Sequence, residues 1–191
     1  MFEVRVHGRG GQGVVTAAEL LSIAAFLEGR HAQAFPSFGS ERTGAPVVAF
    51  CRIDDREIRT REPIVEPDAL IVQDPTLLGQ VPVFDGLQAD GFVVVNSGRQ
   101  IENLDLPRIA HRPERWISVP GTELARKITG RPVPNAALLG AFAAVSGVVS
   151  LDSVTTAILQ RFRGPVAAAN ATVARVAYDV ARTEIEEHEH A

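Results

Sequence analysis

A short run of residues near the N-terminus has the composition and spacing of a phosphate-binding loop: Gly8, Arg9, Gly10, Gly11, Gln12 and Gly13. The glycines at positions 8, 10 and 13 match the dinucleotide-binding fingerprint. In that fingerprint, glycines permit a tight turn and let phosphate oxygens approach the backbone N–H groups at the start of a helix. The same residues are equally typical of a plain tight turn between a strand and a helix, so both interpretations stay open.

The carboxylate that would complete an ordinary NAD site is missing. In NAD-binding proteins, an acidic residue about 20 positions further on, at the end of the second strand, binds the ribose hydroxyls. The corresponding segment here, residues 31–36, contains no Asp or Glu, since Glu28 precedes it and Glu41 follows it. The sequence therefore disfavours NAD as the ligand of the glycine run.

A second polar segment, residues 37–44, lies between two apolar runs and shows no helix or strand period. Its candidate functional residues are Ser37, Phe38, Glu41 and Arg42. We expect this loop to face a partner protein or an active site, where Arg42 pairs with a carboxylate or phosphate in bidentate fashion. The alternative is a structured connection whose charges are solvated.

Composition argues against several other kinds of site. Cys51 is the only cysteine, so the chain holds no internal disulfide, four-thiolate iron–sulfur cluster or multi-cysteine zinc site, and we expect it to be buried. The five histidines are scattered, which predicts no metal site. A net charge of −4, with one Trp and one Tyr, disfavours nucleic-acid binding. A hydrolase is disfavoured because the sequence lacks a Gly-x-Ser-x-Gly elbow.

The sequence predicts no membrane segment. The longest apolar stretch, residues 136–149, is shorter than the ~20 residues that span a bilayer. The N-terminus enters an alternating strand pattern at once and lacks the basic and apolar regions of a signal peptide. Together with the lone cysteine, these features lead us to expect a cytoplasmic protein.

Hydrophobic periodicity predicts the elements that must position the candidate residues. A strand over 2–7 and a helix over 14–27 flank the glycine run. Further strands are expected at 30–35, 45–53, 69–73, 91–96 and 115–119, with a hairpin return at 57–61 and a helical turn at 76–78. Helices are expected at 122–129, capped by Thr122 and stopped by Gly130, and at 135–147, 151–162 and 165–187. Residues 1–191 should then form one α/β domain, Rossmann-like, with a mostly parallel sheet flanked by helices and a helical C-terminal layer.

Three segments resemble, in their order and spacing, the gamma subunit or gamma-equivalent domain of the 2-oxoacid:ferredoxin oxidoreductases, which include pyruvate:ferredoxin oxidoreductase. The first is residues 6–21, with His7-Gly8-Arg9-Gly10-Gly11-Gln12-Gly13 and Thr16-Ala17-Ala18-Glu19. The second is residues 32–53, with Phe38-Gly39-x-Glu41-Arg42-x-Gly44-Ala45-Pro46, where Thr43 is a mild departure. The third is residues 134–142, with a Leu-Gly-Ala-Phe end.

The resemblance implies a multisubunit enzyme that oxidatively decarboxylates a 2-oxo acid on thiamine diphosphate. Such an enzyme passes electrons through iron–sulfur clusters to ferredoxin or another acceptor and transfers the acyl group to coenzyme A. This chain has neither the Gly-Asp-Gly start of a thiamine diphosphate and Mg²⁺ motif nor enough cysteines for a cluster. Thiamine diphosphate, Mg²⁺ and 4Fe-4S clusters are therefore expected on partners, namely alpha and beta subunits and a ferredoxin-like subunit.

The expected role of the chain is that of a noncatalytic gamma subunit, with the glycine run as the candidate site for coenzyme A. A pure scaffold within the same complex is an alternative, and so is a free-standing nucleotide-binding protein. Pyruvate is the default 2-oxo acid, and branched-chain or aryl 2-oxo acids such as phenylglyoxylate are the other candidates.

Overall fold

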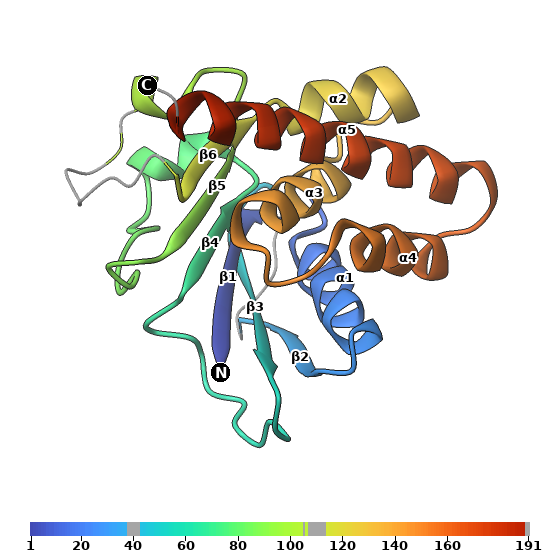
Figure 1. The fold of residues 1–191 in the computed structure, drawn as a ribbon. Helices are drawn as coiled ribbons and strands as arrows, with labels where there is room; N and C mark the ends of the chain where they lie inside the picture. The colour runs from blue at the N-terminus through green and yellow to red at the C-terminus, as the bar shows by residue number, and fades with distance from the viewer. Residues whose placement is uncertain (38–42, 105, 107–113, 190–191) are drawn as a thin grey trace.

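Within the residues that the structure describes, the chain forms a six-stranded sheet with a helical layer on one face (Figure 1). The computed structural model describes residues 1–37, 43–104, 106 and 114–189. The strands are β1 (Phe2–Arg9), β2 (His31–Pro36), β3 (Pro46–Asp54), β4 (Ala69–Val72), β5 (Phe92–Asn96) and β6 (Trp116–Val119). The α-helices are α1 (Val14–Leu27), α2 (Gly121–Thr129), α3 (Asn135–Ser146), α4 (Leu151–Arg161) and α5 (Gly164–Glu189), and the 3-10 turns are η1 (Pro75–Gly79) and η2 (Ile101–Asn103).

The sheet has the strand order β2-β3-β1-β4-β5-β6. Strands β1, β4, β5 and β6 are parallel, and β3 is antiparallel to both of its neighbours. The predicted Rossmann-like α/β fold with a mostly parallel sheet is confirmed. The hairpin return predicted at residues 57–61 is wrong, because β3 already pairs on both sides: Cys51 lies opposite Val4 of β1 and Ala34 of β2.

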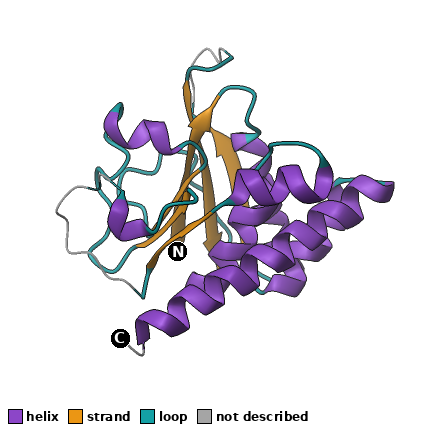
Figure 2. Cartoon of the chain, turned by 90° about the horizontal axis from the view of Figure 1, so that it is seen from above, coloured by secondary structure: helices purple, strands orange, loops and turns teal. Residues whose placement is uncertain are grey.

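The larger core lies between the sheet and the helices. The alternation of β1 directs Val4 and Val6 into this core, where both are fully buried. Helix α3 lies between the sheet and α5 (Figures 1 and 2). Every residue of α3 from Asn135 to Ala143 is buried. Between Asn135 and Ser146, helix α3 is apolar on all sides rather than amphipathic, which is typical of a helix covered on two sides.

The opposite face of β1 carries Arg5, His7 and Arg9. On this side the chain between β4 and β6 packs on the sheet through a smaller core that includes Leu70, Val72 and Trp116. Arg5 ties this connection to β1, since its Nη2 donates to the carbonyl oxygens of Val83 at 2.7 Å and Asp85 at 2.6 Å. The charged face of β1 thus holds the 74–86 segment in place.

The beginning of α2 differs from the prediction. Pro120 occupies the N-cap position and Thr122 lies inside the helix, so the cap predicted at Thr122 is wrong. The N–H and hydroxyl of Thr122 bind the Asn96 side chain at the end of β5 instead. Gly130, in the left-handed region at φ 77°, ends the helix as predicted. These contacts bring the start of α2 to the carboxyl edge of the sheet.

Candidate functional site

The glycine run begins in the last two residues of β1, Gly8 and Arg9, and continues as the turn into α1 at the carboxyl edge of the sheet. Gly8 is required by close packing, because a Cβ there would lie 2.6 Å from Val14 Cγ2 and 2.9 Å from Gln73 Oε1. Gly13 is required by its backbone, which has φ 76° and precedes the first residue of α1. Among the described residues, no side chain caps this helix N-terminus. The first-turn N–H groups of α1 are therefore left for water or a ligand.

The guanidinium of Arg9 is bound to the protein itself. Its Nε donates to Asp74 Oδ2 at 2.9 Å, and its Nη1 donates to the Gly44 carbonyl at 3.1 Å. Its Nη2 donates to Thr76 Oγ1 at 2.8 Å and to Gln80 Oε1 at 2.7 Å. These contacts join the end of β1 to η1. Arg9 therefore supports the turn through contacts within the protein, and its part in a coenzyme A site stays a prediction.

Gln12 completes this support. Its Oε1 accepts from the Arg9 backbone N–H at 2.7 Å, and its Nε2 donates to Asp74 Oδ2 at 3.1 Å. Burial alone would raise the pKa of Asp74, but hydrogen bonds from Thr76 and Gln12 and the charge of Arg9 lower it below its usual value. Asp74, ionised just after β4, thus pairs with Arg9 and, with Gln12, holds the glycine turn against η1.

A chain of buried amide side chains runs along the carboxyl edge from the glycine turn to α2. Asn135 Nδ2 donates to the Gly13 carbonyl at 3.1 Å, and Gln73 Nε2 donates to Asn135 Oδ1 at 2.6 Å. Asn96 Nδ2 donates to the Gln73 carbonyl at 2.8 Å and to Thr122 Oγ1 at 2.7 Å. The starts of α1, α3 and α2 are therefore held together by one connected polar network.

A groove of about 470 Å³ opens beside the glycine turn. We call it the glycine-turn groove; its lining includes Gly11–Gly13 and Thr16, then Arg131 and Val133 after α2, and the start of α5 from Pro165 to Asn170. The exposed Val133 and Val166 make one wall apolar. The uncapped N-terminus of α1 and the cationic Arg131 lie at the same groove. This combination suits a ligand with an anionic group and an apolar arm.

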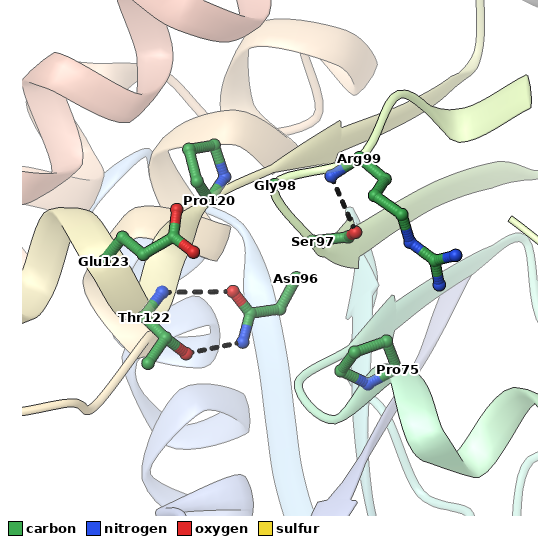
Figure 3. Close-up of a pocket in the computed structure, with 8 residues that line it drawn as sticks. All are labelled: Pro75, Asn96, Ser97, Gly98, Arg99, Pro120, Thr122 and Glu123. Atoms are coloured by element: carbon green, nitrogen blue, oxygen red, sulfur yellow. Dashed lines mark hydrogen bonds between the residues drawn. The ribbon is translucent and has the colours of Figure 1, made fainter. Parts of the chain in front are cut away.

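A second hollow, of about 550 Å³, lies further along the same edge (Figure 3). We call it the β5–β6 cavity; it is lined by Pro75, Asn96, Ser97, Gly98, Arg99, Pro120, Thr122 and Glu123. Its floor is Asn96, which is 8% exposed and hydrogen-bonded to Thr122. Ligands of open α/β sheets bind in such crevices beyond the carboxyl ends of the strands.

The other predicted site residues are placed only in part. Phe38, Glu41 and Arg42 lie outside the described residues, so their expected contact with a partner stays a prediction. Ser37 follows β2, and its N–H donates to the Val48 carbonyl at 2.9 Å. Sequence reasoning missed Arg131 and Arg99, which lie in ordinary polar turns. It also missed Gln73 and Asn135, although a polar residue directly after an apolar strand or at the start of an apolar helix is a usable signal.

Cys51 is fully buried, as predicted, and burial raises the pKa of its thiol to about 12. It is therefore a core side chain and not a nucleophile at neutral pH. Among the described residues, no group of three or more His, Cys, Asp or Glu side chains is arranged to hold a metal ion. No helix in this part of the chain combines the length and apolarity that a membrane crossing needs.

The sequence matches the family model described as pyruvate ferredoxin/flavodoxin oxidoreductase over residues 3–180. Among known proteins, it is 48% identical over 185 residues to the pyruvate/ketoisovalerate oxidoreductases common subunit gamma of Pyrococcus furiosus, covering 97% of this chain and 98% of that protein. It is 50% identical over 179 residues to the pyruvate synthase subunit PorC of Methanocaldococcus jannaschii, covering 94% and 96%.

A solved structure agrees with these similarities. The pyruvate oxidoreductase subunit PORC of Thermotoga maritima has a TM-score of 0.78 and 34% identity, with 93% of this chain and 95% of that chain covered. The fold and these similarities thus define a Rossmann-like subunit. The chain belongs to the pyruvate ferredoxin/flavodoxin oxidoreductase family, as a gamma-type subunit, which confirms the resemblance seen in its sequence.

Proposed function

We propose that this chain is the gamma subunit of a multisubunit 2-oxoacid:acceptor oxidoreductase that converts a 2-oxo acid such as pyruvate to its acyl-coenzyme A. The observation that carries the proposal is the near full-length similarity to subunits named for pyruvate and ketoisovalerate oxidoreductases. Pyruvate and ketoisovalerate are both 2-oxo acids, and ketoisovalerate is branched. Pyruvate and branched-chain 2-oxo acids are therefore the first substrates to test.

The thiamine diphosphate and iron–sulfur clusters of such an enzyme do not fit the residues of this chain. Its single cysteine is buried and cannot replace the thiolates of a 4Fe-4S cluster. The part of the chain that the structure describes also offers no acidic cluster suited to a Mg²⁺ ion with its diphosphate. We therefore assign these groups to alpha, beta and ferredoxin-like partner subunits, which deliver electrons to ferredoxin or another acceptor.

The role of this chain is to assemble with those subunits and to bind coenzyme A in the glycine-turn groove. A phosphate of coenzyme A fits the uncapped N-terminus of α1, where Gly13 and Thr16 line the groove. Arg131 supplies the cation, and Val133 and Val166 supply an apolar wall for the pantetheine arm. Arg9 and Gln12 act indirectly in this arrangement, because they hold the turn in shape.

The test is native purification of a tagged full chain from its own cells. We expect alpha, beta and ferredoxin-like subunits to copurify, and we expect the purified complex to reduce an electron acceptor only when both a 2-oxo acid and coenzyme A are present. A panel of pyruvate, branched-chain and aryl 2-oxo acids identifies the substrate. Purification of the chain alone, with binding of a free nucleotide, would support the free-standing alternative instead.

A further inference from the structure

The β5–β6 cavity has the features of a ligand site that the glycine-turn groove does not explain. It is formed by three segments that follow parallel strands: Pro75 after β4, Ser97–Arg99 after β5, and Pro120 with the first turn of α2 after β6 (Figure 3). Its volume of about 550 Å³ is within the range of small-molecule sites. Its lining shares no residue with that of the groove, and Asn96 of the cavity is linked to Asn135 of the groove through hydrogen bonds of Gln73.

The rim and floor of the cavity are fixed before any ligand arrives. The Ser97 N–H donates to the Val119 carbonyl at 2.9 Å, and the Arg99 N–H donates to Ser97 Oγ at 3.0 Å. Ser118 Oγ donates to the Arg99 carbonyl at 2.7 Å. A binding site with a pre-ordered backbone loses less entropy on association.

Two opposite charges face this cavity without pairing. The guanidinium of Arg99 and the carboxylate of Glu123 lie on different sides of Ser97 and Gly98 (Figure 3). Within the described residues, neither side chain forms an ion pair or a side-chain hydrogen bond. Gly98 lets the carboxylate approach, since a Cβ there would lie 3.3 Å from Glu123 Oε2. The cavity therefore offers one anion-binding group and one acceptor of hydroxyl hydrogen bonds.

We propose that the β5–β6 cavity binds a phosphorylated ribose, with its phosphate at Arg99 and its hydroxyls at Glu123. Guanidinium groups bind phosphate oxygens, and a carboxylate accepts hydrogen bonds from ribose hydroxyls. Pro75 and Pro120 add apolar walls that pack against a ring. A zwitterionic amino acid would also match the two charges, but it would fill little of about 550 Å³.

The test is calorimetric titration of the purified full chain with AMP, adenosine 3′,5′-bisphosphate, ribose 5-phosphate, inorganic phosphate and glycine. We expect the ribose phosphates to bind, Arg99→Ala to weaken them at least about tenfold, and Glu123→Gln to weaken them about threefold or more. The matched control Arg175→Ala, at an exposed position on α5, should bind as the unmodified chain does. Thermal unfolding of each variant checks that it is folded.

The two nucleotides test the contact between Glu123 and the ribose hydroxyls. AMP keeps both hydroxyls and should bind more tightly than the 3′,5′-bisphosphate, in which a second phosphate replaces one of them; tighter binding of the bisphosphate would contradict this contact. The inference is overturned if no ribose phosphate binds, if Arg99→Ala leaves their affinity unchanged, or if inorganic phosphate or glycine binds as well as ribose 5-phosphate. The titration uses the chain alone, so failure of the copurification test would not affect its outcome.

Discussion

The side chain of Asn135 and the backbone of Gly13 fit each other at the start of two helices. Asn135 Nδ2 donates to the Gly13 carbonyl at 3.1 Å, and the same nitrogen lies 2.6 Å from where a Cβ on Gly13 would be. The hydrogen bond joins residues 122 positions apart in the sequence. A side chain at position 13 is therefore disfavoured twice, by the left-handed backbone and by contact with Asn135 of α3.

Gly13→Ala should destabilise the protein more than Gly29→Ala. Both glycines have nearly the same φ, 76° and 78°, so each alanine costs about 1–2 kcal/mol for the left-handed backbone. Only the Gly13 variant also displaces Asn135, which adds roughly 1–3 kcal/mol for disturbed buried hydrogen bonds. Nothing lies within 4 Å of a Cβ at Gly29. Urea unfolding measures the difference, and equal losses for the two variants would show that the Asn135 contact is unimportant.

Arg9→Ala should lower the free energy of unfolding by roughly 1–3 kcal/mol, because it removes a hydrogen-bond donor from Asp74, Thr76 and Gln80. Arg9→Lys should recover little of this, since one ammonium group cannot reproduce the planar fork. The control is Arg59→Ala, whose side chain is 86% exposed and should change stability by less than ~0.5 kcal/mol. Arg9→Ala with unchanged stability in chemical denaturation would contradict the supporting role.

His7 should make the fold sensitive to acid. Burial, and then the charge of Arg5, lower the pKa of His7 to about 3, whereas an unfolded His titrates near 6.5. Between these values the unfolded chain binds more protons, so the free energy of unfolding falls as pH falls, by up to ~1.4 kcal/mol per pH unit.

His7→Leu should reduce this dependence between pH 7 and pH 5, and the exposed His31→Gln serves as the matched control. Unfolding in urea at several pH values gives the slope. The same slope in His7→Leu and in the unmodified chain would show that another group causes the acid sensitivity.

The isolated chain should be colourless and inactive with any 2-oxo acid. Its one cysteine is buried, and thiamine diphosphate and the clusters are expected on other subunits. Absorption spectra of the purified chain, before and after addition of the partner subunits, test this expectation. Visible absorption by the chain alone that survives removal of loosely bound iron would refute it.

The elements around the glycine run could be predicted because their patterns are local. Strand β1 alternates between core residues such as Val6 and charged residues such as Arg5, and α1 begins directly after a glycine turn. The place of β3 between β1 and β2 could not be predicted, because the local sequence of a strand does not determine which strands it pairs with. A turn after β3 therefore looked like the start of a hairpin.

The site was less predictable than the fold, because its side chains find partners far along the chain. Arg9 belongs to the glycine run that the sequence singles out, yet its acceptor Asp74 lies 65 positions away. Nothing near Arg9 in the sequence indicates that its charge is already paired. Arg131 joins the groove only because α2 and α5 pack beside the glycine turn, which is a tertiary relationship.

The most direct test is the coenzyme A dependence of the assembled enzyme carrying Arg131→Ala in this subunit. Loss of one charge-assisted hydrogen bond to phosphate should raise the half-saturating concentration of coenzyme A about tenfold or more. The half-saturating concentration of the 2-oxo acid should not change, and the matched control Arg175→Ala should alter neither. Unchanged coenzyme A dependence in Arg131→Ala, in a complex that assembles normally, would contradict the claim that the glycine-turn groove binds coenzyme A.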